Sequence, residues 1–315
     1  MSEASVRTLT VACTSGLSNR LRVLLSGMAL AEASGRRFTM YWPRTKECAA
    51  SFTELFSNAW SVTNVSGAQW ANLRENADRE RVKSDLLRTE TPHLYFWTSH
   101  TLVMPHRYPA HEPLLHRMAE LLADMHLSDD VMGRVVAFTA SVFRPRMVGV
   151  HLRRGDMRVL EPIRAHNTTT AMQAVDAYLV QSPYAGILLC TDDGAPNQYT
   201  GQPLPAEGVR AKFVQRYGER VVSTTPRSLD RSAPIAIQDA LVDLWLLRQT
   251  DFFVGTAGSS FSDMVMLGRS VPVTVCQSQH PLRYLLPLRI WLSGERSWKW
   301  LGRYYWRIIR PRAAR

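Results

Sequence analysis

The sequence predicts an α/β protein, and its second half is expected to fold as a doubly wound parallel sheet. Apolar runs of strand length alternate with helical patterns from residue 147 onward, which is typical of βαβ units. Clusters of polar residues follow three of these runs. Open α/β sheets bind ligands outside the carboxyl ends of their strands, so these clusters predict a ligand site. The length of 315 residues leaves room for a second domain in the first half.

The first half begins with a predicted strand at 8–13, because β-branched residues alternate there with others. Leucines at helical spacing follow the loop at 16–20 and predict a helix that ends at Gly35. Residues 52–56 are expected to be helical. The other elements expected in this half are strands at 36–42, 61–65 and 93–97 and amphipathic helices at 112–125 and 128–142.

The second half is more regular, and Pro145 marks the expected crossing into it. Its apolar runs predict strands at 147–151, 187–191, 220–223, 251–255 and 271–276. The helical patterns between them predict helices at 168–181, 206–217 and 234–249 and a further one that begins near Ser259.

Two adjacent arginines, Arg153 and Arg154, follow the strand at 147–151. Neighbouring guanidinium groups repel each other unless an anion lies between them, and the planar donor geometry of arginine matches phosphate oxygens. Surface ion pairs with Asp156 and a nearby glutamate would also explain the two arginines. The pattern alone gives both interpretations equal weight, and the other polar clusters favour the anion.

Asp192 and Asp193 directly follow the strand at 187–191, and a Gly-Thr-Ala-Gly-Ser-Ser run follows the strand at 251–255. Each cluster alone is typical of a helix cap or a loop. Three strands that direct polar residues to one edge of a sheet favour a common ligand.

The chemistry of the three clusters fits a nucleoside diphosphate. Guanidinium groups and the donors at a helix start bind a diphosphate, and carboxylates accept hydrogen bonds from ribose hydroxyls or from the N–H groups of a base. The residues expected to contact this ligand are Arg153, Arg154, Gly258, Ser259 and Ser260 for the diphosphate and Asp192 or Asp243 for the nucleoside.

Several other classes are excluded. No Gly-x-Gly-x-x-Gly or Walker-type loop is present, which argues against a dinucleotide dehydrogenase and a P-loop enzyme. The four cysteines are scattered and form no Cys-x-x-Cys pair, so neither a disulfide framework nor a zinc site is expected. Asp-x-Asp dyads are also absent. We therefore predict no metal, and arginine and helix N-termini would neutralise a leaving diphosphate instead.

These motifs resemble those of the inverting fucosyltransferases, which include the core α1,6-fucosyltransferases and the bacterial nodulation fucosyltransferase, with the protein O-fucosyltransferases as more distant relatives. Residues 148–156 are similar to their Gly-Val-His-Val-Arg-Arg motif and read Val-Gly-Val-His-Leu-Arg-Arg-Gly-Asp. Residues 189–193 resemble the second motif, and residues 240–260 resemble the third, a helix and strand that end in Gly-Thr-x-Ser-Ser. The loop at 15–20 is similar to the family's first-domain loop, although a plain strand–turn–helix joint would also explain it.

The resemblance implies a GT-B fold, in which two Rossmann-like domains face a cleft, and a GDP-fucose donor that is bound without a metal or other cofactor. The implied N-terminal Rossmann-like acceptor domain spans 1–144. The C-terminal nucleotide-sugar-binding domain spans 145–280, and a basic, aromatic tail spans 281–315.

The resemblance also implies roles for single residues. Arg153 would be the essential diphosphate-binding arginine, with Arg154 as its supporting neighbour, and Glu161 lies where core fucosyltransferases place a catalytic carboxylate. As a general base, Glu161 would deprotonate an acceptor hydroxyl while the diphosphate leaves; an ion pair with Arg158 or Arg164 explains it equally well. The other residues carried over are His151 and Asp243 at the guanosine, Ser259 at the phosphates, Asp192, Asp193, Thr256, Gly258 and Ser260 at the donor, and Gly16, Asn19 and Arg20 in the N-terminal loop.

Two departures from the family pattern concern the donor site. The third motif reads Ala-Gly-Ser-Ser-Phe at 257–261, where relatives carry glutamine after the two serines. Met157 replaces a basic residue that some relatives carry near the base.

The tail carries most of the positive charge. Residues 281–315 hold nine Lys or Arg against Glu295 alone, so +8 of the net charge of +11 lies there and +3 in the body. The body therefore has no nucleic-acid signature. Aromatic residues lie between the basic ones, and this mixture suits an anionic membrane surface at about 1 kcal/mol per basic side chain. We expect 296–315 to associate with such a surface; the alternative is that 281–292 packs on the N-terminal domain and the rest is a solvated arm.

Neither an apolar signal region at the N-terminus nor a spanning segment is found, so we expect a cytoplasmic protein that is peripheral on the inner face of the membrane. The leading hypothesis is transfer of fucose from GDP-fucose to a glycan or lipid-linked oligosaccharide in polysaccharide biosynthesis. One alternative is an enzyme with the same fold that uses another GDP-sugar, because nothing in the sequence identifies the fucosyl group as the one recognised. The other is a catalytically silent nucleotide-sugar-binding or membrane-associated protein.

Overall fold

The computed structural model describes residues 6–66, 69–70, 85–154, 161–195 and 208–276, with the backbone alone for 161–166 and 275–276. The predictions for the tail at 281–315, and those for Asp156, Met157 and Arg158, lie outside these residues. None of the helices in the described ranges has the length and apolar character needed to span a membrane.

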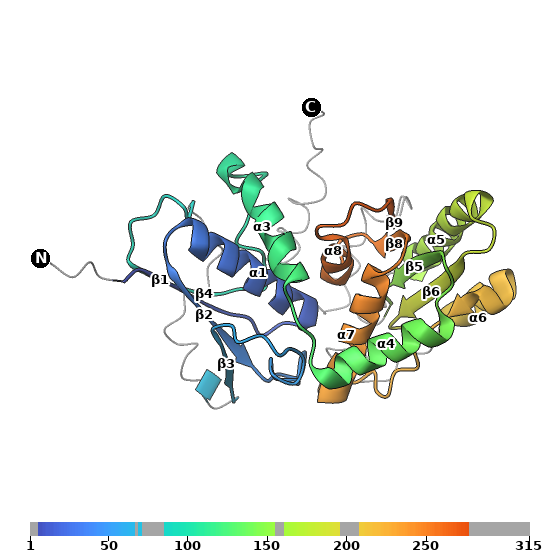
Figure 1. The fold of residues 1–315 in the computed structure, drawn as a ribbon, viewed down its shortest axis with the longest axis horizontal. Helices are drawn as coiled ribbons and strands as arrows, with labels where there is room; N and C mark the ends of the chain where they lie inside the picture. Colours follow the sequence, from blue (N-terminus) through green and yellow to red (C-terminus); the bar gives the residue numbers. More distant parts are fainter. Residues whose placement is uncertain (1–5, 67–68, 71–84, 155–160, 196–207, 277–315) are drawn as a thin grey trace, which may run out of the picture.

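Two parallel sheets form the frame of the molecule (Figure 1). The first has the strand order β3-β2-β1-β4, and the second has the order β7-β6-β5-β8-β9. In each sheet the first strand in the sequence lies inside, next to a strand reached by a crossover, as in doubly wound folds. The strands are β1 Thr8–Ala12, β2 Arg37–Pro43, β3 Val62–Val65, β4 His93–Trp97, β5 Met147–Leu152, β6 Gly186–Thr191, β7 Val221–Val222, β8 Phe252–Thr256 and β9 Val273–Cys276.

Helices connect the strands and join the two sheets. The helix α1 packs against α3 and also against α8 of the second half, and α4 packs against α7. The helices are α1 Leu17–Ala33, α3 Glu112–Ala123, α4 Asp129–Val142, α5 Glu161–Gln181, α6 Val209–Tyr217, α7 Pro234–Arg248 and α8 Ser260–Met266, with 3-10 turns at Pro109–His111 and Gly218–Arg220.

The largest apolar core is shared by both halves. It runs from Leu9 and Leu24 beside the first sheet to Leu241 and Phe253 beside the second. A separate core on the other face of the second sheet includes Val150 and joins α5 and α6 to it. The strands β5, β6 and β8 are buried almost throughout, because helices cover both faces of this sheet. The α/β prediction is therefore confirmed.

Three local predictions need correction. Residues 52–56 form a turn instead of a helix, because Phe56 pairs with Leu127 and the Ser57 N–H donates to His126 O at 3.0 Å. The loop expected at 16–20 is shorter, since α1 already begins at Leu17 and Gly16 is its N-cap. The helix expected at 168–181 begins at Glu161, so the threonine run at 168–170 lies inside it.

Candidate functional site

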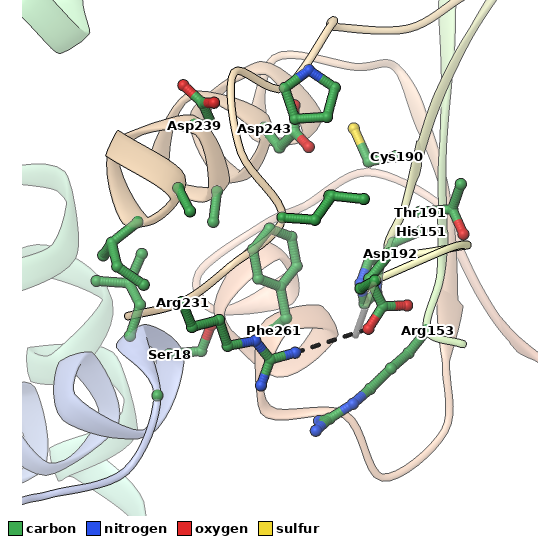
Figure 2. A pocket seen from close by; sticks show the side chains of 18 of the residues that line it. Ser18, His151, Arg153, Cys190, Thr191, Asp192, Arg231, Asp239, Asp243 and Phe261 are labelled. Carbon is green, nitrogen blue, oxygen red and sulfur yellow. Dashed lines mark ion pairs between the residues drawn. The ribbon is translucent and has the colours of Figure 1, made fainter. Parts of the chain in front are cut away.

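A cavity of about 710 Å³ lies between the two halves of the chain, at the carboxyl ends of the strands (Figure 2). Its walls come from the loop after β1, the loop after β2, and the segments that follow β5, β6, β7 and β8. Residues from the first half that line it are Ser15, Gly16, Leu17, Ser18, Asn19 and Glu47. Polar residues from the second half are His151, Arg153, Thr191, Asp192, Asp193, Arg210, Ser223, Thr224, Ser228, Arg231, Asp239, Asp243, Ser259 and Ser260.

The wall from the first half is the start of α1. Gly16 is the N-cap of this 17-residue helix, and Asn19 lies in its first turn. The Asn19 side-chain oxygen accepts a hydrogen bond from Arg22 at 2.7 Å, and Arg22 also pairs with Asp263 of α8 at 3.5 Å. The cavity wall is therefore tied directly to the second half.

Arg20, a predicted member of this loop site, does not line the cavity. Its side chain is fully buried, lies over the Trp42 ring, and donates to Ser15 O at 2.7 Å, Pro43 O at 2.6 Å and Thr45 Oγ1 at 3.0 Å. These bonds hold the loop after β1 against the end of β2. The structure thus gives Arg20 a bracing position behind the loop instead of a ligand contact.

Arg153 lies at the end of β5 and lines the cavity. Its backbone N–H donates to Thr256 Oγ1 at 3.2 Å, and that hydroxyl donates to His151 O at 2.8 Å. Thr256 therefore fixes the backbone before and after the strand end, although its own side chain is not part of the cavity wall.

Arg154 points to the other side of the sheet. It is buried, its guanidinium donates to Thr168 of α5, and its backbone N–H donates to Asp192. Consecutive residues of an extended chain direct their side chains to opposite faces, so Arg153 shares a face with His151 and Arg154 does not. The structure separates the two arginines that the sequence pairs at one diphosphate.

His151 is buried in the cavity wall. Its ring stacks on Phe261 with centroids 4.6 Å apart, and its Nδ1 lies 2.8 Å from Ser262 Oγ, which accepts a hydrogen bond from the Thr256 N–H. Burial, helped by the charge of Arg153, lowers the pKa of His151 to about 3. The imidazole is therefore neutral at physiological pH.

Asp243 lies on α7, lines the cavity and is half-buried beside Cys190 of β6. Its Oδ1 accepts a hydrogen bond from the Thr224 hydroxyl at 2.5 Å, and Cys190 forms a second side-chain hydrogen bond with it. Burial raises the pKa of Asp243 to about 6, and the nearby Asp239 carboxylate adds to this rise. In Figure 2, Asp243 and Arg153 lie on opposite sides of the cavity.

The remaining predicted residues differ in their relation to the cavity. Ser259 and Ser260 line the cavity, and the Ser259 hydroxyl is buried with no hydrogen-bond partner in the described part of the chain. Asp193 lines the cavity but also caps α6 by accepting the Val209 N–H at 3.0 Å. Gly258 has φ +71° and forms the turn before α8 instead of a cavity contact. For Glu161, the first residue of α5, only the backbone is described.

Sequence reasoning missed the segment between β7 and α7. It supplies Ser223, Thr224, Ser228 and Arg231 to the cavity, and Arg231 pairs with Asp192 at 3.6 Å (Figure 2). A signal was present, because this segment follows a predicted strand just as the three polar clusters do. Asp239 of α7 was missed as well; it binds Arg134 at 2.6 Å and Arg227 at 2.9 Å.

No group of three or more His, Cys, Asp or Glu side chains that could hold a metal ion occurs within the described ranges. Cys13, Cys48 and Cys190 are buried free thiols.

Solved fucosyltransferases share this fold. The α1,6-fucosyltransferase NodZ soaked with GDP-fucose matches with a TM-score of 0.54 and 16% identity over 83% of this chain and 92% of that chain. NodZ from Bradyrhizobium matches with a TM-score of 0.54 and 15% identity over 87% of this chain and 98% of that chain. A variant of Arabidopsis thaliana FUT1 in complex with GDP gives a TM-score of 0.57 and 14% identity, over 89% of this chain and 73% of that chain.

No protein-family model matches the sequence, and a search of curated proteins found no match. The solved structures above show that the chain has the GT-B fold of these fucosyltransferases, as its motifs imply.

Proposed function

We propose that this protein is an inverting glycosyltransferase that takes fucose from GDP-fucose and transfers it, without a metal ion, to a glycan or lipid-linked oligosaccharide in polysaccharide biosynthesis. The observation that carries the proposal is the cavity between the two sheets, which has the Arg153 guanidinium on one side and the Asp243 carboxylate on the other. The solved structures of this fold include proteins bound to GDP or soaked with GDP-fucose.

The guanosine would lie beside Asp243 and His151. A guanine base presents N–H and NH₂ donors, and the Asp243 carboxylate is an acceptor that no guanidinium or ammonium occupies at hydrogen-bond distance in the described part of the chain. His151 is neutral and is held in one ring plane by Phe261, so it can form a directed hydrogen bond to the nucleoside without adding charge.

The diphosphate would lie between Arg153 and Ser259. Arginine matches two phosphate oxygens at once, and its charge offsets the negative charge that builds up on the leaving diphosphate. The Ser259 hydroxyl supports this position, because a buried hydroxyl without a partner is costly until it donates to a ligand. Asp192, Asp193 and Ser260 line the same cavity.

Transfer would be a single displacement. The acceptor hydroxyl oxygen bonds to the anomeric carbon while the bond from that carbon to the diphosphate breaks, and a carboxylate takes the hydroxyl proton. Glu161 is the candidate base that the motif resemblance implies. Glu47 is a second candidate, because it is the only carboxylate that the first half contributes to the cavity wall within the described residues.

The acceptor would bind on the side formed by 1–144, the donor on the side formed by 145–280. The tail at 296–315 would hold the enzyme on the inner face of the membrane, next to a lipid-linked acceptor. A liposome flotation assay tests this part: the full chain should float with anionic vesicles, and a chain truncated after Gly294 should not. Equal flotation of both would refute the role of the tail.

Isothermal titration tests the donor class. The protein is titrated in EDTA with GDP, GDP-fucose, GDP-mannose and UDP-glucose, with Arg153→Ala as the control. Binding of the guanosine ligands alone, lost in the variant, is the expected result. Absence of any nucleotide binding by folded protein would refute the proposal. If the protein binds GDP-fucose but shows no turnover, it is the catalytically silent nucleotide-sugar-binding protein. If it binds GDP-mannose more tightly and turns it over, the donor is another GDP-sugar.

A further inference from the structure

We propose that Arg231 is the second phosphate-binding cation of the donor site, the role that the sequence motif gives to Arg154. This inference rests on the proposed GDP-sugar function and adds a residue that the motifs do not contain. It follows from three observations: the position of Arg231 in the cavity, the rigid turn that carries it, and the direction of Arg154 away from the cavity.

Arg231 lines the same cavity as Arg153, and in the view of Figure 2 the guanidinium groups of the two side chains lie near each other, below the Asp192 carboxylate. Its guanidinium is 3.6 Å from Asp192 Oδ2, and the two side chains are 34% and 21% exposed. An ion pair at this distance and exposure contributes little free energy. A diphosphate carries more charge than one carboxylate, so it can replace Asp192 as the partner of Arg231.

The turn that carries Arg231 is fixed by its own side chains. Asp230 accepts hydrogen bonds from the Ser232 N–H at 2.9 Å and the Ser232 hydroxyl at 2.7 Å, and the Ala233 N–H donates to Asp230 O at 2.9 Å. These bonds close a turn with Arg231 at its second position, where the side chain projects outward. Only the side chain of Arg231 has to move to meet a phosphate.

The segment between β7 and α7, which includes this turn, is hydrogen-bonded to α7 on one side and to the first half of the chain on the other. The Arg227 N–H donates to Asp239 at 2.6 Å, and Thr224 binds Asp243 at 2.5 Å. On the other side, the Ala49 N–H of the first half donates to Arg231 O at 3.2 Å. Arg231 is therefore held at a fixed place between the nucleoside side of the cavity and the acceptor half.

Arg154 cannot fill this role from its position in the structure. Its guanidinium binds Thr168 on the far face of β5, while Arg153 faces the cavity. Arg153 lines the cavity whereas Arg154 contacts α5, so these two neighbours do not face one ligand in the structure, while Arg153 and Arg231 line the same cavity from different segments. Arg153 and Arg231 thus form the pair that the sequence assigns to Arg153 and Arg154.

The test compares the affinities for GDP and guanosine, measured by titration, in wild type, Arg231→Gln and Asp192→Asn. The Arg231→Gln protein should bind GDP about tenfold to hundredfold more weakly, the range for one charge-assisted hydrogen bond, with unchanged affinity for guanosine. Asp192→Asn keeps an oxygen for the Arg154 N–H but removes the charge that competes for Arg231. Its ratio of GDP to guanosine affinity should equal or exceed that of wild type.

The inference is overturned if Arg231→Gln binds GDP as wild type does, or if it loses GDP and guanosine affinity equally. It is also overturned if Asp192→Asn lowers the affinity ratio as much as Arg231→Gln, because the ion pair itself would then be what matters. Failure of the wild-type protein to bind GDP would refute the proposed function first, so the two failures are distinguishable.

Discussion

The pKa of Asp243 predicts that donor binding depends on pH between 5 and 7. A carboxylate can accept hydrogen bonds from the guanine N–H groups, and a protonated carboxyl group loses this capacity at one oxygen. Burial and, to a smaller extent, the Asp239 carboxylate raise the pKa of Asp243 to about 6, against the hydrogen bonds from Thr224 and Cys190 and the charge of Arg134, which lower it. The group therefore changes its charge within the range where most enzymes are assayed.

The size of the effect follows from this value. With a pKa of about 6, only about a tenth of Asp243 is ionised at pH 5, so the affinity for a GDP-sugar should be about tenfold lower there than at pH 7.

The contribution of Asp243 to the free energy of unfolding should change in the opposite direction, falling as pH rises. The pKa of Asp243 is higher in the folded protein than in the unfolded chain, so the folded state binds more protons between pH 4 and 6 and its contribution to stability falls as pH rises.

The assay is titration with GDP-fucose at pH 5, 6 and 7. GDP itself is unsuitable, because its terminal phosphate also titrates near pH 6. His151 adds no change in this range, since its pKa is about 3. Asp243→Asn is the matched control and should bind weakly with no pH dependence. Equal affinity of the wild-type protein for GDP-fucose at pH 5 and 7 would refute the assignment of Asp243 to the guanosine.

Three further predictions concern the fold and the chemistry. Gly149→Ala should lower the free energy of unfolding by about 1–3 kcal/mol in urea titrations, because the new Cβ would lie 2.6 Å from Thr250 Oγ1. Gly133→Ala, in α4 with no atom within 4 Å, should raise it by about 0.5–1 kcal/mol; the reverse order would contradict the packing of β5. Arg20→Met should lower the free energy of unfolding by about 3 kcal/mol and leave GDP affinity unchanged. A folded variant that has lost GDP affinity would show that Arg20 belongs to the binding site after all. Glu47→Gln and Glu161→Gln separate the two candidate bases: the true one should lower kcat by about 10² to 10⁴, and full turnover of both variants would exclude both.

The second sheet was predictable because burial on both faces leaves a simple pattern in the sequence. The central strand β5 is buried along its whole length, so its residues form an uninterrupted apolar run that ends where the polar cluster begins. The carboxyl ends of β5, β6 and β8 carry the His151, Asp192 and Ser259 groups that meet in the cavity. Parallel strands share one edge, so the order of elements alone brings these groups together.

The direction of single side chains was harder to predict. The motif gives Arg153 and Arg154 as one unit, but in the structure Arg153 lines the cavity and Arg154 contacts α5; the alternation of side chains along a strand could have separated them. Arg20 looked like a ligand contact because it follows a glycine loop, yet α1 starts early enough to turn it into the interior. Arg231 lies in the segment after the strand predicted at 220–223, a position that signals the ligand edge of the sheet, but only the folded chain shows that Arg231 pairs with Asp192.

A crystal structure of the protein with GDP-fucose would test the central claim most directly. We expect the diphosphate within hydrogen-bond distance of the Arg153 guanidinium and the guanine beside Asp243, in the cavity between the two sheets. A nucleotide bound outside this cavity, or one whose guanine lies at Arg153, would contradict the assignment of the donor site.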